Sequence, residues 1–405
     1  MIYDVYLEWS SSELYYVLSA FYLGYTLSHV FSGMLSDLYG AKYIFCGSLL
    51  GCAIMSIIMT YTLKLSWFYS AIVEGLLGVL QGIAMPAIFS LLSRWLPNDH
   101  KTILLSYGFS GGCLGSLLNG VLSAYFVKIK NWEGLFYCWA GLTFVCCIPL
   151  TIFIYSSPAV HPWVSAQERA VLKRDLGTAQ PKRIPLKAII HDSAVWAIAA
   201  AEVGHNYSFI TLDTYLPRIL SEIAASDFTA DITAFILIYS FQWISALSFG
   251  YLGNNLIRRR HVPTIYLRCF FGALGNIVPS IISLLTLYVG CNSGVIIGFL
   301  TMAQICKGAV IPGILCNVLD ITIHYAGVVY AIQNCVGAIF AMIIPPVVGR
   351  IVQQQVIEEW RKVFWLVTGI SLFTTVYFLI FCKGERAWWD VIEEDSEETS
   401  EDSSF

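Results

Sequence analysis

The sequence predicts an all-α polytopic membrane protein. Hydrophobic residues make up 57% of the 405 residues and charged residues only 12%, about half the charged share of a water-soluble domain. Nearly uncharged stretches such as 43–63, 132–155 and 364–382 reach about 20 residues, the length that an α-helix needs to cross a bilayer. They lack the short alternating pattern of barrel strands, and backbone polar groups in lipid must bond within their own segment, so we expect helices.

Eleven such stretches follow one another along the chain. Each is long and apolar enough for one membrane-spanning helix. The predicted spans are 13–35, 42–63, 66–96, 101–127, 132–155, 192–220, 231–257, 262–289, 292–319, 325–350 and 362–382. The small-residue run 108–120 in the fourth span predicts close approach to a neighbouring helix.

One long polar connection, residues 156–191, separates the fifth predicted span from the sixth. It divides the chain into an N-terminal bundle of five spans (1–155) and a C-terminal bundle of six spans (192–382). Residues 383–405 are dominated by acidic side chains and have too little apolar surface to order themselves, so we expect a solvated tail. Placing the connection and the tail in the cytosol puts roughly twice as many lysines and arginines on the cytosolic side as on the other, which is the expected orientation.

Composition also narrows the function classes. A formal net charge of -4 argues against nucleic acid as a partner. The 12 cysteines are scattered singly, without paired C-x-x-C spacing, which predicts packing residues rather than metal ligands or redox centres. No nucleophile lies beside a base at a recognisable spacing, so we expect neither an enzyme nor a cofactor.

Two pairs of similar segments relate the two halves of the sequence. GMLSDLYGAK at 33–42 has a faint counterpart in GYLGNNLIRRR at 250–260, and PAIFSLLSRW from Pro86 has one in PGILCNVLDI from Pro312. Two such pairs in the same order predict homologous halves, the architecture of many secondary transporters. Because the N-terminal half has one span fewer, we expect the missing span to precede Ser11.

At these residues the chain resembles the major facilitator superfamily, whose signature is G-x-L-x-D-R-x-G-R-[KR]. Gly33, Asp37, Gly40 and Lys42 match it, and Leu38 stands where arginine is usual. Further stretches resemble the anion:cation symporters, which include sialin, the vesicular glutamate and nucleotide transporters and the sodium/phosphate transporters. These stretches are VLQGIAMPAIFSLLSRWLP (79–97), GFSGGCLGSLLNG (108–120), SSPAVHPWVSAQER (156–169), HNYSFITLDTYLP (205–217), CNVLDI (316–321) and KGERAWWD (383–390).

The resemblance implies a fold of two pseudo-symmetric helix bundles with twelve spans, of which the first is absent from this chain. It implies a secondary active transporter that moves a small organic or inorganic anion, of the carboxylate or phosphate class, by alternating access. The expected partners are the anionic substrate, a coupling cation and the lipid bilayer, with a proton gradient, a sodium gradient or the membrane potential as the driving force. A non-transporting sensor or an inactive truncated paralogue is the alternative, and both the plasma membrane and a lysosomal or vesicular membrane remain open.

Charged residues inside the predicted spans are the candidates for substrate binding or coupling. A charge within the membrane costs free energy unless it is paired or faces water. Glu74 lies in the third span, and Gln81 follows seven residues later on the same helix face. Glu202 and His205 are three residues apart on the sixth span, and Lys307 is near the middle of the ninth. In the superfamily, the corresponding helices line the central cavity.

The functional interpretation makes Lys307 and His205 the cationic side of an anion site and Glu74 or Glu202 a proton-coupling carboxylate. The alternative is that one of these glutamates forms a salt bridge with Lys307 and only holds helices together. By resemblance, His205 stands where vesicular glutamate transporters carry a substrate-associated arginine. Glu74 and Gln81 stand where those transporters have arginine and glutamate.

In the superfamily the signature aspartate pairs near a neighbouring helix end and acts as a cytoplasmic latch. The resemblance assigns this role to Asp37, with Arg94 and Lys101 as the expected partners, whereas the simpler interpretation is a solvated turn carboxylate. The predicted cytoplasmic gate comprises Gly33, Asp37, Gly40, Lys42 and Arg94.

Overall fold

The computed structural model describes residues 9–177, 181, 183–223, 228–289, 292–353 and 356–390. Within these ranges the regular structure is helical, without strands, as the sequence predicts. Residues 1–8, where the span expected before Ser11 would join the chain, lie outside the described residues. Most of the predicted acidic tail, residues 391–405, also lies outside them.

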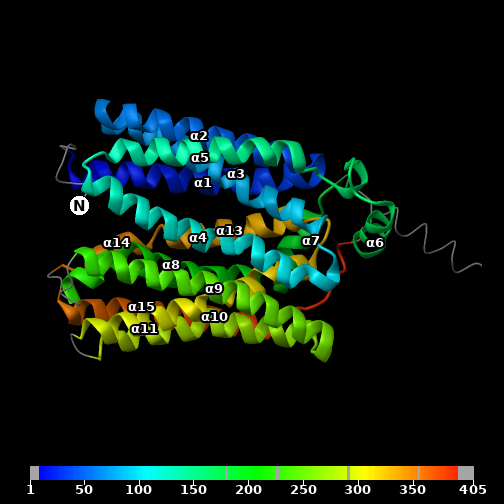
Figure 1. The fold of residues 1–405 in the computed structure, drawn as a ribbon. Coiled ribbons are helices and arrows are strands. Elements are labelled where there is room, and N and C mark those ends of the chain that lie inside the picture. The colour runs from blue at the N-terminus through cyan, green and yellow to red at the C-terminus, as the bar shows by residue number, and fades with distance from the viewer. Residues whose placement is uncertain are drawn as a thin grey trace, which may run out of the picture.

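The N-terminal half contains five long helices, which occupy the upper part and the middle of Figure 1. They are α1 (Ser11–Tyr39), α2 (Lys42–Leu65), α3 (Trp67–Ser93), α4 (Lys101–Lys128) and α5 (Trp132–Phe153). α3 packs against both α1 and α2, and α5 packs against α2. Close packing of α1 on α3 depends on glycine, because a Cβ at Gly78 would collide with the Phe21 carbonyl oxygen.

The C-terminal half has four unbroken helices, α8 (Ser193–Ile223), α9 (Phe228–Arg260), α10 (Thr264–Thr286) and α15 (Ile357–Phe381). Two further segments are broken. α11 (Ser293–Lys307) continues through a π-helical turn at Ile311–Leu315 into α12 (Cys316–Ile321), and α13 (Ala326–Ala341) is followed by α14 (Ile344–Ile351). Proline residues stand at the start of the π-helical turn and of α14, where their missing N–H breaks the regular hydrogen-bond ladder.

The long connection carries two short helices, α6 (Ala166–Leu176) and α7 (Leu186–His191). Both lie at one end of the bundle, on the right of Figure 1, which we call the loop end. The charge distribution predicts that this end is cytoplasmic. The two halves meet where α1 contacts α13 and where α4 contacts α9.

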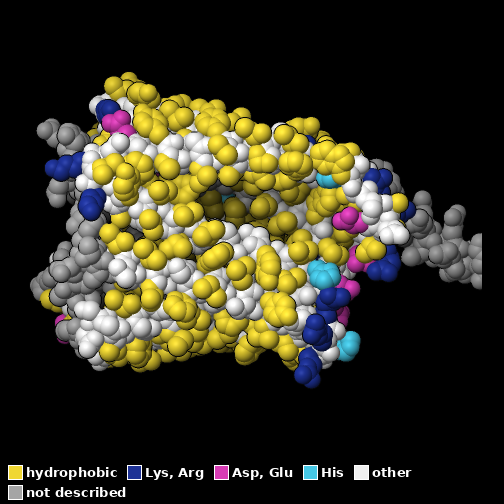
Figure 2. All heavy atoms as spheres, viewed as in Figure 1, with side chains coloured by type: hydrophobic (Ala, Val, Ile, Leu, Met, Phe, Trp, Pro, Cys, Tyr) yellow, Lys and Arg dark blue, Asp and Glu magenta, His cyan; other side chains and the backbone are white. Residues whose placement is uncertain are grey.

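Nine helices of the described residues are long and apolar enough to cross a membrane. α1 and α8, with 29 and 31 residues, are also long enough, and they lie in the same bundles. Figure 2 shows hydrophobic side chains over the flank of the bundle, whereas Lys and Arg gather at its two ends. The chain is a multi-pass membrane protein, and the count of eleven spans stays a prediction.

Among the glycines of the small-residue run of α4, Gly120 makes the predicted close approach, packing against the Phe235 ring. Within the described structure, nothing lies within 4 Å of the position that a Cβ would take at Gly108, Gly111, Gly112 or Gly115. The prediction of close helix approach is therefore wrong for these four glycines. At Gly112 the open space is the central cavity.

Candidate functional site

A central cavity of about 730 Å³ lies between the two halves. Its N-terminal wall comes from α1 to α5, and its C-terminal wall comes from α8, α9 and the segment that joins α11 to α12. Figure 2 shows a hollow near the middle of this face, beside α4. The lining residues are Tyr25, Leu49, Cys52, Gln81, Ala84, Met85, Phe109, Gly112, Cys113, Ser116, Thr143, His205, Phe209, Gln242, Lys307, Gly308, Val310, Ile311 and Leu315.

The structure brings Lys307 and His205 together in this cavity, as the sequence interpretation requires. Lys307 is the last residue of α11 and is 2% exposed, and its Nζ lies 5.1 Å from the centroid of the Phe209 ring. The His205 ring stacks on the same phenylalanine, with 5.8 Å between ring centroids. An ammonium group over an aromatic face is a stabilised cation, so Lys307 is a buried cation in this wall of the cavity.

The opposite wall is uncharged and mostly apolar, with a few polar side chains. Gln81 reaches the cavity from α3 and Ser116 from α4. Among the described lining residues there is no aspartate or glutamate. The described residues also contain no group of three or more His, Cys, Asp or Glu side chains suited to hold a metal ion. The cavity therefore combines a buried lysine with uncharged hydrogen-bonding groups.

The two predicted carboxylates do not line this cavity. Glu202 is 6% exposed and faces α13, where a Cβ at Gly337 would lie 2.9 Å from its Cγ. Glu74 is partly exposed on α3, about two helical turns from Gln81 and nearer the end opposite the loop end. Of the five predicted binding or coupling residues, the structure places Gln81, His205 and Lys307 around the cavity.

The predicted gate residues meet at the loop end, where the Asp37 side chain is 1% exposed. Its carboxylate accepts hydrogen bonds from the backbone N–H of Gly327, at 3.2 Å, and of Val328, at 2.9 Å. These are orphan donors at the first turn of α13, which a carboxylate satisfies well. Arg94 Nη2 donates to the Asp37 carbonyl oxygen at 2.6 Å. Asp37 therefore ties α1 of one half to α13 of the other.

The signature glycines allow this contact. A Cβ at Gly33 would lie 2.5 Å from the Gly327 carbonyl oxygen, so only glycine permits the close approach of α1 to α13. Gly40 ends α1 with a φ of 96°, a left-handed value that favours glycine. Lys42 then begins α2, donating its N–H to Ser156 Oγ at 3.3 Å and placing its Nζ 4.1 Å from the centroid of the Tyr155 ring.

We expect Asp37→Ala to loosen the loop end, because it leaves the Gly327 and Val328 N–H groups without their acceptor. A buried unsatisfied donor costs about 1–3 kcal/mol, so amide exchange at the start of α13 should be about tenfold faster or more. Hydrogen–deuterium exchange read by mass spectrometry measures this directly. Glu168→Ala, at an exposed carboxylate of α6, is the matched control, and equal exchange in the two variants would contradict the latch.

A second polar cluster at the loop end was missed in the sequence. Lys101 lies here rather than beside the Asp37 carboxylate, with its Nζ 2.8 Å from the Leu319 carbonyl oxygen and 3.6 Å from Asp320 Oδ1. Arg268 Nε donates to Asp320 Oδ2 at 2.6 Å. Arg268 falls within the predicted span 262–289, and its side chain is 1% exposed. The sequence did offer one signal for this cluster. Arg268 is a basic residue inside a predicted span, and Asp320 of CNVLDI is an acidic residue that could pair with it.

The start of the predicted solvated tail is in fact packed against the loop end. Lys383 Nζ and Trp389 Nε1 each donate to the Asp192 carboxylate, just before α8, at 2.9 Å. Asp390 accepts hydrogen bonds from Thr322 Oγ1 at 2.7 Å and from the His324 N–H at 3.1 Å. We call residues 383–390 the C-terminal strap, because they join the start of α8 to the turn between α12 and α13.

Comparison with known proteins gives consistent results over nearly the whole chain. The sequence profile of the Major Facilitator Superfamily matches residues 2–305. Sialin from Homo sapiens is 25% identical over 384 residues, which cover 94% of this chain and 78% of sialin. A putative inorganic phosphate cotransporter from Drosophila ananassae is 24% identical over 406 residues, covering 98% of this chain and 84% of the relative. Vesicular glutamate transporter 2.2 from Danio rerio is 24% identical over 398 residues, with coverage of 96% and 68%.

Proposed function

Because the chain belongs to the Major Facilitator Superfamily, we propose that it is a secondary active transporter that moves a small anion across a membrane by alternating access. Two of the relatives are named as transporters of inorganic phosphate and of glutamate, which are both anions. The proposed substrate is therefore a carboxylate or a phosphate. The superfamily is a transporter family, and we propose neither an enzymatic activity nor a cofactor for this chain.

The observation that carries this proposal is Lys307 in the central cavity. Its ammonium group, beside Phe209 and His205, is a cation at the interface of the two halves, where carrier substrates bind. A bound anion would contact both walls, since Gln81 faces it from the N-terminal half. An anion that binds both halves biases the equilibrium between their two arrangements, which is the requirement for alternating access.

The coupling step is assigned to Glu202. This buried carboxylate lies near Tyr25, which itself lines the cavity, and near Tyr330 of α13. Tyr25 accepts a hydrogen bond from Asn334 Nδ2 at 2.8 Å, so the same tyrosine joins α1 to α13. Protonation of Glu202 would remove a buried charge at the point where the halves meet. Glu74, on α3, is the second candidate for this role.

The contacts at the loop end support a carrier state that is closed at that end. Asp37 is bound to α13, and Lys101 of α4 is bound to Asp320 of α12, so both contacts hold the two halves together at that end. Substrate release at the loop end would require both contacts to break.

Reconstitution of the full chain into liposomes tests the proposal. We expect saturable uptake of labelled phosphate, glutamate or another small anion when a proton gradient, a sodium gradient or a membrane potential is imposed. Uptake should stop when that gradient is dissipated with an ionophore. A folded protein that takes up none of these anions under any gradient would contradict the proposal and favour the non-transporting sensor or inactive paralogue.

A further inference from the structure

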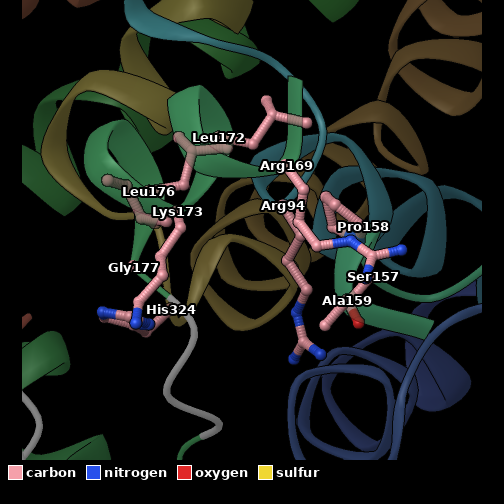
Figure 3. A pocket seen from close by; sticks show the side chains of 11 residues that line it. Arg94, Ser157, Pro158, Ala159, Arg169, Leu172, Lys173, Leu176, Gly177 and His324 are labelled. Atoms are coloured by element: carbon pink, nitrogen blue, oxygen red, sulfur yellow. The ribbon is translucent and has the colours of Figure 1, made fainter. Parts of the chain in front are cut away.

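A second pocket, separate from the central cavity, lies at the loop end (Figure 3). It has a volume of about 150 Å³, roughly five times the share of liquid volume of one water molecule. Its walls come from the end of α3, from the start of the long connection with α6, and from the turn between α12 and α13. The pocket is therefore shared between the N-terminal half, the connection and the C-terminal half.

The charged side chains of this pocket are all basic or histidine. Figure 3 shows Arg94 and Arg169 on one side and Lys173 with His324 on the other. The described residues that line the pocket include no aspartate or glutamate. Arg94 Nη2 and Arg169 Nη2 each donate to an uncharged backbone carbonyl oxygen. The Asp37 carboxylate attracts Arg94, but it is held by the N–H groups of Gly327 and Val328. In the described structure no ion pair joins Arg169 or Lys173 to a carboxylate, whereas the adjacent Arg174 pairs with Asp175 at 3.0 Å.

The pocket is held in place by packing on several sides. Leu172 and Leu176, on the apolar side of α6, are each 5% exposed and fix that helix against the bundle. Asn98 Nδ2 donates to the Asp175 carbonyl oxygen at 3.4 Å, tying the end of α6 to the segment before α4. On the other side, Asp390 of the C-terminal strap binds the backbone N–H of His324. The cationic groups therefore stand on anchored backbone.

We propose that this pocket binds a phosphate group. A phosphate monoester carries a charge of about −1.5 to −2 at pH 7 and has three acceptor oxygens. It therefore suits a site with two guanidinium groups and an ammonium group better than a ligand with a single carboxylate would. The phosphate is that of a soluble cytosolic phosphate compound or of a phosphoinositide headgroup, since the loop end is the predicted cytoplasmic face. Because Arg94 and His324 belong to opposite halves, the bound phosphate holds the loop end closed.

The central test is phosphate binding to the purified full chain that carries Lys307→Gln, so that the proposed transport site does not contribute. The probes are inorganic phosphate, glycerol phosphate, and phosphatidylcholine vesicles with or without a phosphatidylinositol phosphate. We expect binding to at least one phosphate probe. The double variant R169Q/K173Q should weaken it by about tenfold for each cation removed. Both side chains are exposed, so this variant should fold normally.

Arg174→Gln is the matched control, because it removes a neighbouring exposed charge that lies outside the pocket. It should bind as the parent does. Binding of the soluble probes identifies a free phosphate compound as the source, and binding of the phosphoinositide vesicles alone identifies the lipid. No binding of any probe, or equal binding by R169Q/K173Q, would overturn the proposal. These results do not depend on transport, so they are distinguishable from a failure of the proposed function.

A second measurement tests the effect on the gate. Phosphate should slow amide exchange at Gly327 and Val328, because closing the loop end protects the N–H groups that bind Asp37. This protection should be lost in R169Q/K173Q and kept in Arg174→Gln. Phosphate binding without any such protection would overturn the inference that the ligand bridges the two halves.

Discussion

Anion uptake is expected to fall by at least about thirtyfold when Lys307 is replaced by glutamine. Removing one partner of a desolvated charge pair costs about 2 kcal/mol or more, and 1.4 kcal/mol corresponds to a factor of ten. Lys307 is 2% exposed and is the cationic group of the cavity wall beside Phe209. Its loss removes the attraction for the anion without removing the aromatic wall. Initial rates of uptake into liposomes over a range of substrate concentrations provide the measurement.

Lys362→Gln is the matched control, because Lys362 is an exposed lysine near the start of α15. It should transport as the parent chain does. Lys307→Arg keeps the charge with a longer and flatter group, and it should retain part of the uptake. Normal uptake by Lys307→Gln would show that the anion binds elsewhere. The thermal stability of each variant separates lost binding from lost folding.

Asp320→Ala is expected to produce the largest loss of stability. The substitution leaves Arg268 and Lys101 as buried cations without their shared carboxylate. Breaking a buried ion pair by removing one partner costs about 3–5 kcal/mol. By the usual scaling for large domains, the melting temperature should fall by roughly 6 °C or more. Thermal unfolding of the purified protein in detergent measures this effect.

A double-mutant cycle sharpens the Asp320 prediction. Asp320→Ala combined with Arg268→Leu removes the carboxylate and its principal partner, so the double variant should recover part of the stability that Asp320→Ala loses. Glu133→Gln is the surface control, since Glu133 pairs with the exposed Lys64 at 2.7 Å and should matter little. Additive losses in the cycle, or an unchanged melting temperature for Asp320→Ala, would contradict the interpretation.

Apolar length and helix period were enough to predict the all-α membrane fold, because each span must satisfy its backbone within itself. Contacts between spans that are distant in sequence could not be predicted in this way. Arg268 shows the difference, since its partner Asp320 is 52 residues further along the chain. The fold buries this arginine in an ion pair between α10 and α12.

Helical spacing also limits how finely a site can be predicted. Glu202 and His205 are three residues apart, which turns their side chains about 60° from each other around α8. Because this angle is small, the sequence predicts that the two side chains share one face of the helix. It is nevertheless large enough for the two side chains to contact different parts of the protein. His205 faces the cavity, whereas Glu202 faces α13. The resemblance assigned Asp37 to the gate, but no sequence pattern indicated that its carboxylate would accept hydrogen bonds from backbone amides of α13.

The C-terminal strap has a consequence for the order in which the protein is made. Trp389 and Asp192 are joined by a hydrogen bond although they are 197 residues apart. At a synthesis rate of 5–20 residues per second, roughly 10–40 s pass between the appearance of one partner and that of the other. During this interval the start of α8 lacks the groups that will hold it, and the His324 N–H waits for Asp390, 66 residues further along the chain. The C-terminal half therefore completes its closure at the loop end only after its helices through α15 have been made.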